Sequence, residues 1–107
     1  MNTKIYVSGP YSKHMVDGTR NAILAAEELR KAGYLPFVPH LSLLWDLVCP
    51  SPYEEWIAYD LAWLGHCDAL LRLPGESPGA DREVLLALKL GIPVWYSVRE
   101  VILNERL

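Results

Sequence analysis

The sequence has few of the residues that build metal sites or disulfide frameworks. Its two cysteines, Cys49 and Cys67, form no C-x-x-C pair, and no group of His and Cys has the spacing of zinc ligands. We therefore expect free thiols and a protein that uses neither a metal ion nor a cofactor.

Basic residues and long apolar runs are also scarce. The net charge is -3, with 10 Lys and Arg against 13 Asp and Glu, so we expect no basic patch for a nucleic-acid backbone. No apolar stretch approaches the roughly 18–20 residues that span a bilayer, and no signal-peptide core precedes the first strand-like run. These absences favour a cytoplasmic protein that binds neither nucleic acid nor a membrane.

Apolar and aromatic side chains, in contrast, are abundant. Hydrophobic residues make up 51% of the 107 positions, and the chain contains four Trp and six Tyr. A domain of this size buries a limited share of its surface, and aromatic residues are frequent at interfaces and around ligand pockets. We expect a single domain, residues 1–107, that forms a homodimer or a higher homo-oligomer.

Hydrophobic periodicity and turn residues predict strands that alternate with helices. The expected strands are residues 5–7, 34–38, 69–73 and 92–96, and the expected helices are 17–32, 51–65, 80–90 and 98–103. Pro36 indicates an edge position for the second strand, and residues 39–52 read as a loop with a short helical piece at 43–47. The helix at 80–90 is apolar nearly all round, which predicts burial on most sides.

This alternation is typical of the α/β class. It predicts a single-domain, three-layer flavodoxin- or Rossmann-like fold with a parallel sheet of four to five strands. Ligands of such sheets bind beyond the carboxyl ends of the strands. Residues 8–12, 39–41 and 73–83 fall there, so candidate site residues are sought in these segments.

Glu83 is the first candidate for chemistry. It is expected in the first turn or so of the helix at 80–90, on the stripe that contains Ala80 and Ala87. The positive end of the helix dipole favours an ionised carboxylate there, and such a carboxylate can act as a nucleophile. The alternative is that Glu83 only complements the helix dipole.

Two glycine-containing loops could approach a ligand closely. Ser77-Pro78-Gly79 offers a hydroxyl and free amides at a helix start, an arrangement suited to phosphate, although an ordinary helix cap would look the same. Ser8-Gly9-Pro10-Tyr11 follows the first strand and offers a second close backbone approach.

The other candidates are less specific. Asp60 either is solvated or points toward the strand ends, and His40 follows the second strand either as a pocket residue or as a hydrogen-bonded structural histidine. The four tryptophans are typical of a core or an interface rather than of ligand stacking. His14 and His66 are expected at the surface.

Three segments in register resemble one family. Residues 4–11 (KIYVSGPY) resemble the opening strand and loop of nucleoside 2-deoxyribosyltransferases and their nucleotide N-hydrolase relatives. Residues 60–64 and 67–71 resemble the central helix and strand of that family, and residues 77–83 (SPGADRE) with 91–94 resemble its catalytic segment. The similarity covers nearly the whole chain and is strongest to a small, uncharacterised branch of the superfamily.

The resemblance implies a reaction and a role for each candidate. Glu83 would attack the anomeric carbon and hold a covalent glycosyl intermediate, which water or a second base would release. Asp60 would orient the sugar or assist proton transfer to the leaving base. Tyr6 or Tyr11 would position the nucleophile, with Tyr6 favoured. The implied ligand is a small-molecule nucleotide or nucleoside.

Two departures from the family pattern refine this expectation. Transferases of the family usually carry an acid where this chain has Ser77, and Ser-x-Gly-x-x-x-Glu is similar to the nucleotide N-hydrolases, whose Ser and Gly hold a 5′-phosphate. A hydroxyl and amides favour phosphate, whereas an acid repels it. Many relatives also extend further and place a C-terminal residue in the neighbouring subunit's site, a contribution expected here either to be absent or to come from elsewhere.

We therefore expect cleavage of the N-glycosidic bond of a nucleoside 5′-monophosphate, by hydrolysis or base transfer, through Glu83. One alternative is a non-catalytic nucleotide-binding module on the same fold. Another is a plain interaction domain, which the surplus of tryptophans favours.

Overall fold

Four parallel strands form the centre of the molecule. The computed structural model describes residues 3–11 and 15–106. The strands are β1 (Lys4–Ser8), β2 (Leu35–Phe37), β3 (Ala69–Arg72) and β4 (Val94–Trp95), in the order β2-β1-β3-β4. The expected flavodoxin-like α/β fold is confirmed, and β2, which contains Pro36, is an edge strand as the proline predicts.

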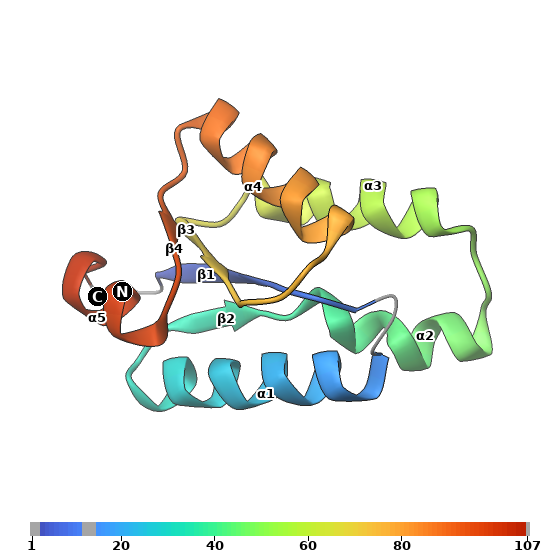
Figure 1. Cartoon of the computed structure of the whole chain (residues 1–107), viewed down its shortest axis with the longest axis horizontal. Helices are drawn as coiled ribbons and strands as arrows, with labels where there is room; N and C mark the ends of the chain where they lie inside the picture. The colour runs from blue at the N-terminus through green and yellow to red at the C-terminus, as the bar shows by residue number, and fades with distance from the viewer. Residues whose placement is uncertain (1–2, 12–14, 107) are drawn as a thin grey trace.

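Helices cover both faces of the sheet and complete three layers (Figure 1). Figure 1 shows α1 (Met15–Lys31) on one side of the sheet and α3 (Tyr53–Leu64) with α4 (Pro78–Leu90) on the other. The short helix α5 (Val98–Asn104) packs with α1, while the 3-10 turn η1 (Pro39–Leu41) and α2 (Ser42–Val48) lead from β2 toward α3. None of the described helices has the length and apolar character needed to cross a bilayer.

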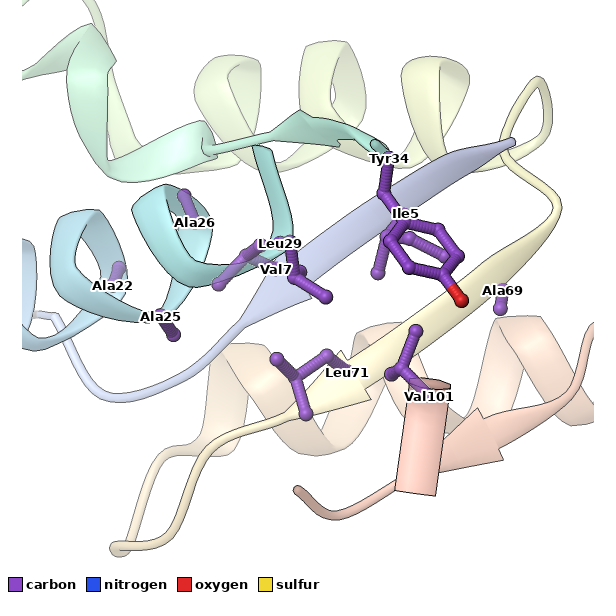
Figure 2. Close-up of a cluster of buried hydrophobic side chains, with 10 residues drawn as sticks. All are labelled: Ile5, Val7, Ala22, Ala25, Ala26, Leu29, Tyr34, Ala69, Leu71 and Val101. Carbon is purple, nitrogen blue, oxygen red and sulfur yellow. The ribbon is translucent and has the colours of Figure 1, made fainter. Parts of the chain in front are cut away.

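The α1 side of the sheet holds the larger core. Alternate residues of β1 and β3 point to this face, among them Ile5, Val7 and Leu71, and they meet Leu29 of α1 and Val101 of α5 (Figure 2). The three alanines of α1 in this cluster let the helix lie close to the sheet. This packing fixes the direction of β1 and hence of the loop after it.

The opposite face brings β1 toward α3 and α4. Tyr6 and Leu70 point to this side and pack with Leu64, Cys67 and Ala87. Because side chains alternate along a strand, Ser8 lies on the same face as Tyr6, one step nearer the carboxyl edge of the sheet. The face that contacts α4 is therefore the one that carries the polar residues of β1.

Local signals set most helix ends. Gly33 and Gly91 have φ of 99° and 75°, the left-handed conformation that ends a helix, and they follow α1 and α4. Ser77 caps α4 by accepting a hydrogen bond from the amide of Ala80 at 3.1 Å. Ser51, a serine just before α3, could be taken for its cap, but α3 has no side-chain cap and the Ser51 amide donates to Asp46.

Two further expectations are corrected. Residues 39–52 are largely helical, because η1 and α2 occupy 39–48. Helix α4 is not buried on most sides of this single chain, since Leu85 and Leu88 are 67% and 61% exposed. His66 is at the surface as expected, and His14 lies outside the described residues.

Candidate active site

A cavity of about 220 Å³ opens beyond the carboxyl ends of β1 and β2. Its walls come from the loop after β1, from η1 and α2, and from the helices α3 and α4. Most of the site residues predicted from the sequence line it: Gly9, Tyr11, His40, Asp60, Ser77, Gly79 and Glu83. The topology therefore brings together segments that lie far apart in the chain.

Glu83 lines the cavity, and two side chains of β1 hold its carboxylate by hydrogen bonds. The Tyr6 hydroxyl donates a hydrogen bond to Oε2 of Glu83, and the Ser8 hydroxyl donates to Oε1 at 2.7 Å. Tyr6 and Ser8 are fully buried, and Glu83 is 6% exposed. Burial, and then the charge of Glu83, raise the pKa of Tyr6, so the phenol keeps its proton and remains a donor.

The electrostatic support of Glu83 differs from the expectation. Helix α4 begins at Pro78, so Glu83 lies in its second turn, where the helix dipole has faded. Burial raises the pKa of Glu83, and the hydrogen bonds from Tyr6 and Ser8 oppose that rise. These two hydroxyls, rather than the helix end, favour the ionised carboxylate.

Asp60 of α3 is the second carboxyl in the cavity and points into it rather than into bulk water. It is 9% exposed. Burial, and then the charge of Glu83, raise the pKa of Asp60 to about 7. Near neutral pH the Asp60 carboxyl can therefore both hold and release a proton, while Glu83 accepts two hydrogen bonds that favour its ionised form. Environments that differ in this way suit an acid and a nucleophile.

The start of α4 offers hydroxyl and amide groups at the cavity wall. Ser77 Oγ accepts from Ala80, so its own proton is available for a ligand. Gly79 is closely packed against α3, because a Cβ added there would lie 2.8 Å from the Tyr53 hydroxyl. Pro78 has no amide proton and the Ala80 and Asp81 amides donate to Ser77, so the Gly79 amide is the one that remains for an anion at this helix start.

His40 and Tyr11 form another part of the wall. His40 Nε2 lies 3.2 Å from each of the carbonyl oxygens of Gly9 and Pro10, so this nitrogen carries the proton. Burial lowers the pKa of His40, which favours the neutral ring. Tyr11 meets the ring edge-on at 5.7 Å. Pro10 does not line the cavity, so its role is to anchor the loop through its carbonyl group.

Sequence reasoning missed one wall of the cavity. Asp46, Ser51, Tyr53 and Trp56 line it, although none was singled out. The sequence predicts a loop with a short helical piece at residues 39–52, and only the fold shows that Asp46 reaches the cavity. Trp56 is predicted from the sequence as a core or interface residue. Within residues 3–11 and 15–106, no three His, Cys, Asp or Glu side chains are grouped to hold a metal ion.

The fold and the cavity together define a flavodoxin-like α/β protein with three carboxyl groups, those of Asp46, Asp60 and Glu83, in a pocket at the carboxyl edge of its sheet. The sequence model of DUF4406, a family described as a domain of unknown function, matches residues 3–96. The chain belongs to this family. No curated protein matches it.

A solved structure shares the fold. It is a 2-deoxyribosyltransferase from the psychrotolerant bacterium Bacillus psychrosaccharolyticus, described as a biocatalyst for the synthesis of nucleosides. The two are 22% identical with a TM-score of 0.59, and the match covers 86% of this chain and 69% of that one. The likeness therefore shows a shared α/β architecture.

Proposed function

We propose that this protein cleaves the N-glycosidic bond of a nucleoside 5′-monophosphate, by hydrolysis or base transfer, with Glu83 as the nucleophile. One observation carries the proposal: the Glu83 carboxylate is fixed by Tyr6 and Ser8 at the wall of a cavity that it shares with Asp60. The fold likeness to a 2-deoxyribosyltransferase supports the same class of chemistry.

The first step forms one bond and breaks another. A Glu83 oxygen attacks the anomeric carbon, the bond from that carbon to the base nitrogen breaks, and the base leaves with its electron pair. Asp60 supplies the proton that the base takes up, which its pKa of about 7 allows at neutral pH. The product of this step is a glycosyl ester of Glu83 and a free base.

The second step regenerates the carboxylate. Water, or the nitrogen of a second base, attacks the anomeric carbon while Asp60, now ionised, accepts its proton. The ester bond to Glu83 breaks, and Tyr6 and Ser8 stabilise the negative charge that returns to the carboxylate. Two hydrogen bonds to the same group also keep it oriented between the two steps.

The phosphate part of the proposal rests on the start of α4. Ser77 and Gly79 line the cavity on the same helix as Glu83, so a 5′-phosphate at Ser77 would place the sugar toward that residue. No Lys or Arg lines the cavity among the residues that the structure describes. The phosphate would therefore be held by the Ser77 hydroxyl and the Gly79 amide.

Chromatography of the released base tests the proposal. The protein is incubated with nucleoside 5′-monophosphates and with the matching nucleosides, and we expect turnover of the phosphorylated forms. Glu83→Ala should lower turnover by several orders of magnitude. Glu76→Gln, an exposed acid just before α4, is the matched control and should retain activity. Turnover of nucleosides alone would contradict the phosphate assignment.

A non-catalytic nucleotide-binding module is the alternative function. It is favoured by the Glu83 and Asp60 carboxyl groups, because these acids could bind the hydroxyl groups of a sugar without cleaving it. A module of this kind would bind nucleotides with the same affinity after Glu83→Ala and release no base from any of them. Calorimetric titration of both proteins, beside the turnover assay, separates the two functions.

We also propose that the chain forms a homodimer or a higher homo-oligomer. Large apolar side chains are exposed on α2 and α4, including Leu44 at 72% and Leu85 at 67%. A second copy of the chain packed on either helix would remove these side chains from water.

A further inference from the structure

Asp46 lies near the end of α2, and within the described residues only one of its two carboxylate oxygens accepts hydrogen bonds. Its Oδ1 accepts hydrogen bonds from the Ser51 amide at 3.0 Å and from the Trp56 indole nitrogen at 2.6 Å. Within the described residues, Oδ2 accepts none. Two donors on one oxygen fix the plane of the carboxylate and leave the second oxygen available for a ligand.

Trp56, which orients this carboxylate, is itself held in place. Its ring meets those of Trp45 and Tyr59 edge-on, with centroids 5.2 and 6.1 Å away. The Ser51 amide, and then the indole, lower the pKa of Asp46, so the carboxylate is ionised at neutral pH. A charged acceptor in a defined orientation is therefore part of the site.

Asp46 shares the cavity with the reacting groups but belongs to a different wall. Glu83 and Asp60 come from α4 and α3, whereas Asp46 comes from α2, beside the aromatic rings of Tyr53 and Trp56. If the sugar lies at Glu83, the base occupies the rest of the cavity. A wall of aromatic rings with one fixed polar group is the usual form of a site that binds a flat, polar ring.

We propose that Asp46 selects the leaving base by accepting a hydrogen bond from its exocyclic amino group, so that the substrates are nucleotides of amino-bearing bases. This inference rests on the proposed function and names the substrate class of the same site.

The chemistry of the bases explains the selection. Adenine, cytosine and guanine each present an exocyclic amino group, which a carboxylate oxygen can approach directly. Uracil, thymine and hypoxanthine instead present carbonyl oxygens, and their ring N–H groups lie beside those oxygens. A carboxylate that approaches such an edge meets a second negative oxygen, so the oxo bases are disfavoured.

The substitution Asp46→Asn tests this role directly, because the two hydrogen-bond donors at the site allow only one orientation of the Asn amide. The Asn oxygen has to accept from Ser51 and Trp56, since an amide nitrogen there would face two other donors. The Asn NH2 group therefore takes the position of Oδ2. The variant turns the acceptor into a donor with almost no change in shape.

The experiment compares matched pairs of nucleoside monophosphates: cytosine with uracil, and adenine with hypoxanthine. The wild-type protein should favour the amino member of each pair by about tenfold to a hundredfold in kcat/KM, the range expected for a hydrogen bond to a charged group. Asp46→Asn should reverse the preference in both pairs. The same pairs are measured by calorimetric titration, which needs no turnover.

Two control variants complete the design. Trp56→Phe keeps an aromatic ring but removes the indole donor, so the preference should weaken without reversing. Glu55→Gln removes one exposed charge next to Trp56 and should leave the preference unchanged. Circular dichroism of all variants checks that each is folded.

The outcomes separate this inference from the proposed function. Turnover with equal rates for both members of each pair, or an unchanged preference in Asp46→Asn, overturns the role of Asp46 and leaves the reaction intact. Selective binding that Asp46→Asn reverses, without turnover, supports the role of Asp46 and overturns the reaction. Failure to bind any of the nucleotides overturns both.

Discussion

Ser8 and Glu83 are joined by a 2.7 Å hydrogen bond between residues 75 positions apart in the chain. The bond connects the end of β1 to the second turn of α4 and holds Oε1 of the carboxylate beside the cavity. Both side chains are buried, so water cannot replace either partner without a cost.

Ser8→Ala should therefore affect both stability and catalysis. Loss of the hydroxyl leaves a buried carboxylate oxygen without its donor, which should lower the free energy of unfolding by about 1–3 kcal/mol. With one of its two donors gone, Glu83 should attack at a rate reduced roughly tenfold or more. Urea unfolding and single-turnover kinetics measure the two effects. An unchanged rate would show that Ser8 does not position Glu83.

Tyr6→Phe should shift the acid side of the pH profile. The Tyr6 hydrogen bond opposes the rise in the pKa of Glu83 that burial causes, so its removal raises that pKa further. Glu83 then becomes ionised only at higher pH, and the rising limb of kcat/KM moves to higher pH. Tyr34→Phe is the matched control, because the Tyr34 hydroxyl bonds to the Glu105 carbonyl, away from the cavity. Equal pH profiles for the two variants would refute this role of Tyr6.

Asp60→Asn should change how stability depends on pH. The pKa of Asp60 is about 7 in the folded protein, against 3.8 ordinarily, so between pH 4 and 7 the folded state keeps a proton that the unfolded state releases. Stability from this group is thus present at low pH and is lost as pH rises through about 7. The neutral Asn avoids that loss. Because the cavity opens to solvent, we expect a gain of about 1–2 kcal/mol at pH 8 relative to pH 4.

Thermal unfolding of the Asp60→Asn variant at several pH values measures this difference. Glu28→Gln, an exposed acid on α1, is the control and should show the pH dependence of the wild type. The same Asp60 variant should lose the limb of the activity profile near pH 7, since it removes the group that protonates the base. If stability varies with pH in the same way for Asp60→Asn and Glu28→Gln, the pKa of Asp60 is not raised in the folded protein.

Gly79→Ala should weaken ligand binding more than it weakens the fold. An added Cβ would lie 2.8 Å from the Tyr53 hydroxyl at the cavity wall. Tyr53 is 48% exposed, so its ring can move to relieve the clash, and that movement changes the shape of the wall. We expect KM to rise roughly tenfold, with stability changed by about 1 kcal/mol or less. Tyr53→Phe removes the oxygen that clashes, so the double variant should recover much of the affinity. If the effects of Gly79→Ala and Tyr53→Phe on KM are additive in the double variant, the clash is not the cause of the loss.

The exposed leucines should determine the assembly state. Leu44→Glu on α2 or Leu85→Glu on α4 places a charge in apolar surface, and at least one of the two should convert the oligomer to a monomer. Light scattering of the purified proteins gives the mass. Arg20→Glu, on the exposed side of α1, is the control and should keep the wild-type mass. A monomeric wild-type protein would contradict the proposal.

The sequence predicted the sheet well because its strands carry strong local signals. Ile5 to Val7 and Ala69 to Leu71 are short apolar runs between turn residues, and both became central strands. The strand expected at residues 92–96 is only two residues long, because Ile92 packs beneath α4 instead of pairing. Strand ends depend on tertiary packing, and a local pattern does not contain that information.

The candidate site was less predictable than the sheet. Glu83 lies in a segment chosen from the strand ends, and Asp60 lines the same cavity, in line with one of the two alternatives left open for it. The contact between Tyr6 and Glu83 fits the role expected of Tyr6. Asp46 could not be chosen, because a single acid in the apolar run of residues 43–48 gives no local sign of its hydrogen-bond partners. Its importance comes from donors at positions 51 and 56 that only the turn between α2 and α3 brings to it.

The central position of β1 has a consequence for how the protein is made. Ile5 pairs with Ala69 on one side and Pro36 on the other, so β1 is completed only after β3 has been synthesised. A nascent chain that has emerged as far as α2 exposes one long edge of β1 and the apolar residues beside it. Such an edge invites pairing with other chains, so partners that shield it during translation should raise the yield of folded protein.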